Sequence, residues 1–198
     1  PHGAGQKETS VAGERVEEGA DLEFTPDHEL KDGDIVEGDG WTLEAVYTPG
    51  HTSNHLCFAL KEENTLFCGD HVMAWSTTVV SPPDGDMASY MKSLQKLKKR
   101  SEKVLWPTHG DGIRNPKEHI TQFIAHRKLR ERQVLGCLKK GINTIPKMVL
   151  EMYNNVPSYL HPAAERSVLA HIIWLVEKGQ VTCTEQPGLD TKYRMGIR

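Results

Sequence analysis

The chain has 198 residues, of which 37% are hydrophobic and 26% charged. These values are typical of a globular protein and exclude wholesale disorder, and the length suits one ordinary domain or one larger and one small domain. No apolar run approaches the roughly 20 residues that a membrane span needs, and no secretory signal is recognisable. We therefore expect a cytoplasmic protein with no membrane partner.

Charge and cysteine usage narrow the possibilities further. Residues 1–114 carry 11 Lys/Arg against 20 Asp/Glu, a net of −9, whereas residues 115–198 carry 13 against 7, a net of +6. This asymmetry predicts two modules, and the second either binds a polyanion or uses a charged helical surface to stay in solution. None of the four cysteines forms a Cys-x-x-Cys pair, which excludes a zinc knuckle. Cys57 and Cys68 either face each other on adjacent strands or remain buried free thiols.

The N-terminal half carries the pattern of strands separated by tight turns. Residues 1–36 are polar, acidic and Gly-rich, which predicts an irregular surface segment, and its opening, PHGAGQKETS, resembles the interior of a longer protein. Farther along, alternating apolar residues predict strands, and apolar residues at helical spacing predict one helix. The expected strands span 35–36, 41–47, 54–60, 65–68 and 103–106, and the expected helix spans 90–100.

From Asn115 onward the pattern is helical. Asn115 is expected to be an N-cap, Pro116 suits the first helical position, and Glu118 completes a capping-box-like pattern. Three helices and a closing hairpin are expected, which is the order of elements in a winged-helix module. The helices span 115–140, 144–152 and 162–179, and the hairpin strands span 180–184 and 192–195. We therefore divide the chain into residues 1–114 and residues 115–198.

Three strand ends carry side chains that suit a metal ion. In the sequences TPGHTSNH, FCGD and PTHG, Pro and Gly let the backbone turn sharply, so that His51, Asp70 and His109 directly follow a strand. Rigid sheets often hold functional groups on such loops. Imidazole and carboxylate are ligands that zinc, iron and manganese accept. Two histidines and one aspartate on neighbouring strand ends are therefore candidates to converge on a cation.

These three motifs, in this order and at these separations, resemble the later motifs of the metallo-β-lactamase superfamily. The resemblance implies a mixed α/β (α+β) fold containing the C-terminal half of an αββα sandwich. It also implies that His51 binds a first metal, that Asp70 bridges two metals and that His109 binds the second. His55 matches a histidine that supports the ligands in related hydrolases. For His71 we expect a structural or substrate-facing role.

The chain departs from the superfamily pattern in one respect. The signature His-x-His-x-Asp-His, which gives two ligands to each metal in family members, is absent from these 198 residues. We therefore expect a chain that lacks the first half of the sandwich, with a single-metal site of two histidines and one carboxylate as the alternative. Because losing one sheet exposes the apolar face of the other, we expect either a bound N-terminal fragment or self-association.

The helical tail resembles the winged-helix extension of the β-lactamase-like protein 2 group. The resemblance rests on FIAHR at 123–127 and RERQ at 130–133, and DMASYMKSL at 86–94 resembles the same group. That group includes a mitochondrial endoribonuclease acting on single-stranded RNA. The candidate substrate contacts are His126, Arg127, Lys192 and Arg194. For His126 and Arg127, the alternative is a helix-surface pair that makes local hydrogen bonds.

Together these features predict a metal-dependent hydrolase with two zinc ions per full-length subunit, and with iron or manganese as alternatives. Metal coordination lowers the pKa of water from 15.7 toward ~7, which supplies a hydroxide nucleophile at neutral pH. The basic tail places RNA ahead of a small ester or thioester as the expected substrate. The alternative is a non-catalytic nucleic-acid-binding or interaction protein built on a decayed metal fold.

Overall fold

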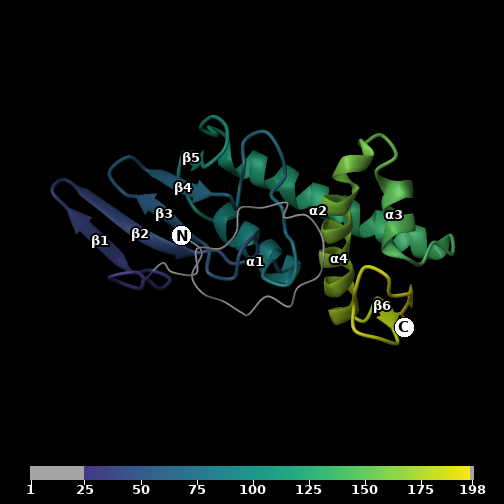
Figure 1. Ribbon diagram of the computed structural model, residues 1–198. Helices are drawn as coiled ribbons and strands as arrows, with labels where there is room; N and C mark the ends of the chain where they lie inside the picture. Colours follow the sequence, from purple (N-terminus) through teal and green to yellow (C-terminus); the bar gives the residue numbers. More distant parts are fainter. Residues whose placement is uncertain (1–24, 197–198) are drawn as a thin grey trace.

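The computed structural model describes residues 25–196. Residues 1–24 of the expected irregular segment therefore lie outside the described residues. The remaining elements follow the expected order and make a mixed α/β fold, which confirms the fold class predicted from the sequence (Figure 1). The elements are β1 (Ile35–Gly38), β2 (Trp41–Tyr47), β3 (Leu56–Leu60), β4 (Thr65–Gly69), α1 (Met87–Lys98), β5 (Val104–Pro107), α2 (Pro116–Lys139), α3 (Ile145–Met152), the 3-10 helix η1 (Ser158–Leu160), α4 (His161–Glu177), β6 (Val181–Cys183) and β7 (Tyr193–Met195).

The larger module is built on a five-stranded sheet with the order β1-β2-β3-β4-β5. Neighbours are antiparallel through β4, and β5 runs parallel to β4. A parallel pair needs a long crossover connection, and α1 lies within it. The ends of β4 and β5 therefore lie at the same edge of the sheet, and the residues that follow these two strands are brought together there.

One face of the sheet packs against α1 and the first half of α2. Alternate residues of the inner strands, among them Val46, Leu66 and Leu105, contribute to this buried core. Cys57 and Cys68 also lie in it as free thiols, and burial raises the pKa of Cys57 to about 12. The buried-thiol alternative is therefore the one found.

The opposite face of the sheet carries large apolar side chains that the described residues leave uncovered. Phe58 lies opposite Phe67, and Phe67 lies opposite Trp106. Phe67 is 43% exposed and Trp106 is 45% exposed, and Trp41 and Tyr47 on the same face are exposed to a similar extent. We call Trp41, Tyr47, Phe67 and Trp106 the open sheet face. Apolar side chains gathered on one surface in this way favour association.

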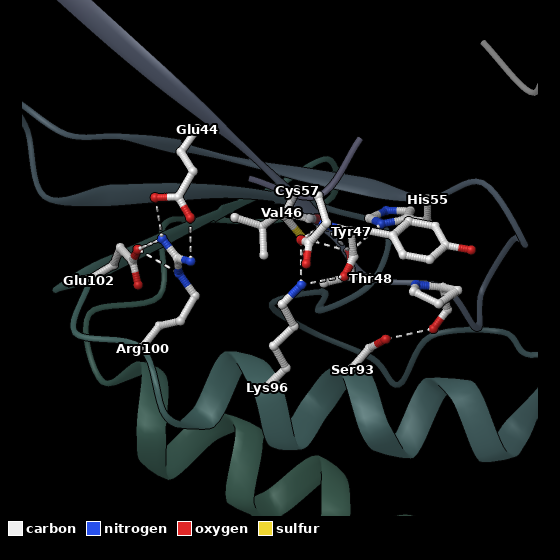
Figure 2. Close-up of polar contacts among 12 residues, drawn as sticks. Glu44, Val46, Tyr47, Thr48, His55, Cys57, Ser93, Lys96, Arg100 and Glu102 are labelled. Carbon is white, nitrogen blue, oxygen red and sulfur yellow. Dashed lines mark hydrogen bonds and ion pairs between the residues drawn. The ribbon is translucent and has the colours of Figure 1, made fainter. Parts of the chain in front are cut away.

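Helix α1 begins three residues earlier than expected, because Asp86 caps it. The Asp86 carboxylate accepts a hydrogen bond from the N–H of Ser89 at 2.7 Å, which satisfies a free donor of the first turn. Polar contacts then attach the helix to the end of β2 (Figure 2). Ser93 donates to the Pro49 carbonyl at 2.8 Å, and Lys96 donates to the Tyr47 carbonyl at 2.9 Å.

A salt bridge between Glu44 and Arg100, two residues after the end of α1, ties the chain leaving this helix to the sheet (Figure 2). Hydrogen bonding from Arg100 lowers the pKa of Glu44, so the stabilisation is complete above the unfolded-state value of about 4.3 and is lost as the pH falls through the lower folded-state value. Glu44→Gln is expected to lower the free energy of unfolding by about 0.5–1 kcal/mol at pH 7, because the pair is partly exposed. Urea unfolding of both proteins between pH 7 and pH 3 checks this. A difference that did not shrink toward pH 3 would contradict it.

Helix α2 contributes to two cores along its length. Its first half, with Ile120 and Phe123, packs in the core under the sheet, and its second half, with Val134 and Leu138, packs with α3, α4 and the β6-β7 ribbon. Asn115 is the N-cap residue as expected, but its side chain makes no capping hydrogen bond. The boundary at 114/115 stays a prediction. None of the helices in residues 25–196 has the length and apolar character that crossing a bilayer requires.

Candidate metal centre

Gly50 lies between the end of β2 and His51, and its position admits only glycine. Gly50 has φ +138°, and a Cβ there would lie 2.3 Å from the Cα of Tyr90, so only glycine lets the turn approach α1 this closely. The Gly50 carbonyl accepts a hydrogen bond from the N–H of Asp86 at 2.9 Å. The glycine of the TPGH motif therefore sets the position of His51 relative to the start of α1.

The His51 ring is held in a defined tautomer. Its Nδ1 lies 2.7 Å from the carbonyl oxygen of Val79. Because a carbonyl only accepts, Nδ1 carries the proton, and Nε2 is left with a free lone pair. That Nε2 lies 3.9 Å from Oδ2 of Asp70. Backbone fixation of one ring nitrogen is how proteins commonly prepare the other for a metal ion.

Asp70 and His109 meet at the shared edge of β4 and β5. Asp70 directly follows β4, and His109 is the second residue after β5. The Nε2 of His109 lies 3.5 Å from Oδ1 of Asp70, an oxygen that is buried and has no hydrogen-bond partner. Side-chain exposure rises from 12% at His51 through 32% at Asp70 to 56% at His109. The group therefore opens to solvent on the His109 side.

The donor set fits a cation in kind but is not a full ligand sphere. A tetrahedral zinc site with bonds near 2.1 Å separates its ligand atoms by about 3.4 Å, close to the two N···O distances around Asp70. The buried Asp70 Oδ1 has no hydrogen-bond partner, and a cation is one kind of partner that a buried carboxylate oxygen accepts. Within residues 25–196, however, no group of three or more His, Cys, Asp or Glu side chains is arranged so that it could hold a metal ion. His51, Asp70 and His109 make up at most three ligands.

Behind these groups lies a stack of aromatic rings. The Nδ1 of His55 lies 2.9 Å from the Thr48 hydroxyl (Figure 2), and its ring centroid is 5.5 Å from that of His71. Gly69 makes room for His55, since a Cβ there would lie 2.8 Å from the His55 Nε2. His71 is fully buried beside Tyr90, and desolvation holds its pKa well below the usual range. His71 is therefore neutral, and it is packed in the protein interior where a substrate does not reach it.

The loop between β4 and α1 supplies contacts that sequence reasoning missed. Besides the Val79 carbonyl, the buried Thr78 hydroxyl donates to the Asp70 carbonyl at 2.7 Å and lies 3.0 Å from the His71 carbonyl. A Ser-, Thr- and Pro-rich loop of this length without regular structure is usually functional, and that length was the available signal. No side-chain pattern could point to Val79, because its contribution is a backbone carbonyl.

A cavity of about 560 Å³ lies beside the turn that carries His109. Trp75, which is 72% exposed, lines it together with Gly110, Arg114, His119 and Gln122. Its walls mix the ring of Trp75 with the cation of Arg114, the carboxylates of Asp111 and Glu118, and amide groups, an arrangement that suits a small polar ligand with an apolar part.

The four predicted substrate contacts are not gathered at this site. Arg127 is 2% exposed, and its guanidinium lies against the ring of Tyr90. His126 is half-buried, and burial lowers its pKa to about 4. Lys192 and Arg194 are exposed, and Figure 1 places the β6-β7 ribbon beyond α4, away from the five-stranded sheet.

Comparison with known families decides the classification. Residues 2–109 match the model of the metallo-beta-lactamase superfamily, which is more than half of the chain. The chain belongs to the metallo-beta-lactamase superfamily. Residues 144–189 match the beta-lactamase associated winged helix domain, which confirms the predicted winged-helix module.

Curated members of the superfamily resemble the chain over much of its length. A lactamase-like protein, adaB, from Aspergillus niger is 30% identical over 190 residues, covering 87% of this chain and 58% of its own length. An atrochrysone carboxyl ACP thioesterase, AgnL7, from Paecilomyces divaricatus is 40% identical over 119 residues, covering 59% of this chain and 37% of its own length. The chain thus spans about half the length of the curated relatives it matches.

Solved structures of the superfamily share the fold. A beta-lactamase domain protein from Burkholderia ambifaria has a TM-score of 0.74 at 22% identity, covering 85% of this chain and 52% of its own. A metallo-beta-lactamase family protein from Thermus thermophilus has a TM-score of 0.72 at 24% identity, covering 84% and 53%. At these identities the likeness concerns the fold alone.

Proposed function

We propose that the protein is a metal-dependent hydrolase of ester or thioester bonds. The observation that carries this proposal is the Asp70 carboxylate: its unpartnered Oδ1 lies 3.5 Å from the Nε2 of His109, and its Oδ2 lies 3.9 Å from the Nε2 of His51. The Val79 carbonyl keeps one of these nitrogens free to act as a ligand. Nothing in the hydrogen bonding of the described residues gives these three groups another use.

Each residue has a distinct part in the proposed reaction. His51, Asp70 and His109 are the residues that would hold the metal, with Asp70 placed next to both imidazoles. When bound, the metal would supply a hydroxide nucleophile near neutral pH and polarise the bond under attack. The exposed side of His109 is where a substrate enters, and Trp75 and Arg114 in the adjacent cavity bind its remaining part.

A thioester or ester is the better substrate proposal than RNA. One relative is named as a thioesterase acting on an acyl carrier protein, and its matched region is 40% identical to this chain. RNA was favoured by the basic tail, but the exposed cations Lys192 and Arg194 lie on the ribbon away from the sheet, and Arg127 is buried. The positive charge of the tail therefore lies away from the candidate metal centre.

The test is turnover of two substrate classes by the longest expressed form of the protein that contains these 198 residues. The metal-free protein is assayed after addition of Zn²⁺, Mn²⁺ or Fe²⁺ on short-chain acyl thioesters and on a single-stranded oligoribonucleotide. Metal-dependent release of free thiol, absent with chelator, supports the proposal. Cleavage of the oligoribonucleotide without thioester turnover would replace the proposed substrate, and metal-independent turnover would refute the mechanism.

A further inference from the structure

The candidate metal centre is connected to helix α2 through a single buried arginine. Arg127 is among the largest fully buried side chains of the described structure, at 2% exposure. Its Nη2 donates a hydrogen bond to the carbonyl oxygen of Thr78, and its guanidinium lies 5.0 Å from the ring centroid of Tyr90. Within residues 25–196 no carboxylate pairs with it. A buried cation whose acceptor is a loop carbonyl fixes that loop strongly, because a charged donor strengthens the bond and burial excludes competing water.

The loop that Arg127 holds is the one that orients the candidate ligands. Thr78 O accepts from Arg127, and the next carbonyl, Val79 O, accepts from His51 Nδ1. The Thr78 hydroxyl donates to the carbonyl of Asp70. Two of the three candidate ligands therefore depend on the placement of residues 78 and 79, and these residues have no regular secondary structure of their own.

We propose that Arg127 is a positioning residue of the metal centre. This proposal rests on the proposed function. Arg127 holds the backbone of Thr78 and Val79 in place. The Val79 carbonyl then keeps His51 in the Nδ1–H tautomer, so that Nε2 faces the metal position. It contacts neither metal nor substrate. Through Arg127, helix α2 of the helical module determines the geometry of the site beside the sheet.

Helix α2 offers a matched control one turn away. Arg130 is on the same helix, but it donates to Gln133 and to the Met152 carbonyl and lies over the ring of Tyr153. It contacts the helical module and makes no hydrogen bond to the β4-α1 loop. Arg130→Met therefore removes the same charge from the same helix, at a partly buried position, without touching residues 78 and 79.

The experiment compares wild type, Arg127→Met, Arg127→Lys and Arg130→Met in the metal-free, ¹⁵N-histidine-labelled 198-residue protein. The ring ¹⁵N shifts at pH 8 report the His51 tautomer, and competition with a chromophoric chelator measures the affinity for Zn²⁺ alone. Arg127→Met is expected to move His51 toward the Nε2–H tautomer and to weaken zinc binding roughly 10-fold. Arg127→Lys is expected to change both in the same direction by less, because lysine lacks the planar fork of donors. Arg130→Met is expected to match wild type.

Wild-type His51 signals in Arg127→Met, or equal changes in Arg130→Met, would overturn the proposal. If Arg127→Met does not fold, a folded Arg127→Lys with wild-type signals and wild-type zinc affinity overturns it. A wild-type protein that binds no zinc counts against the proposed function. The tautomer shifts still decide whether Arg127 positions His51.

Discussion

Asp70→Asn is expected to abolish metal-dependent hydrolysis while leaving the fold intact. Asp70 is the group that both His51 and His109 approach, and its Oδ1 has no donor in the described structure. Even residues that only support metal ligands change metal affinity by about 10–100-fold, so loss of this carboxylate is expected to lower it by more than about 100-fold. Zinc content and thioester turnover of the purified variant measure the effect.

Asp70→Asn is also expected to affect the thermal stability of the metal-free protein in one direction. In the metal-free protein, Asp70→Asn removes a partly buried carboxylate that has no hydrogen-bond donor on one oxygen, so the midpoint of thermal unfolding is expected to stay the same or to rise. Asp39→Asn, in the exposed β1-β2 turn, is the control for loss of a carboxylate elsewhere. A variant at position 70 that keeps full zinc content and turnover would show that Asp70 is not a ligand.

Removing two aromatic side chains from the open sheet face is expected to weaken self-association of the 198-residue protein. Phe67 and Trp106 are neighbours across β4 and β5, and each is more than 40% exposed. We expect a second copy of the chain to cover this face in solution. Full burial of a large apolar side chain contributes about 1.5–3 kcal/mol, and slightly less than half of each of these side chains remains to be buried, so the double substitution to serine is expected to weaken association by about 10- to 100-fold.

Sedimentation at several protein concentrations measures this association. Because Phe67 and Trp106 are each nearly half exposed in the monomer, the unfolding midpoint of the double variant is expected to change less than after loss of fully buried side chains. The control replaces two exposed apolar residues of the helical module, Leu150 and Tyr159, with serine. A monomeric wild type at all concentrations, or equal loss of association in the control, would be evidence against the open sheet face as the contact surface.

The sequence predicted the sheet and the approach of His51, Asp70 and His109 for one physical reason. Period-two alternation marks the strands, and Pro and Gly mark their ends, so residues placed directly after strands could be identified without knowing the topology. The sheet topology brings Asp70 and His109 together, because β5 runs parallel to β4 and both strands end at the same edge. The roles of the three residues as ligands stay predictions.

The features that sequence reasoning missed depend on backbone groups and on burial. Val79 acts through its carbonyl, which every residue possesses, and therefore leaves no mark in the sequence. Arg127 sits among charged residues on a helix, where a solvated side chain is the usual outcome, yet it is buried by contacts with Thr78 and Tyr90. Helix periodicity is also continuous through α2, so nothing in the sequence indicated that one helix serves two cores.

Diffraction from zinc-soaked crystals, recorded at the zinc absorption edge, tests the proposed metal centre most directly. The expected result is an anomalous peak within bonding distance of the Nε2 atoms of His51 and His109 and of an Asp70 carboxylate oxygen, with the His51 Nδ1 still on the Val79 carbonyl. A peak at other residues only, or a structure in which these three side chains lie apart, would contradict the proposal.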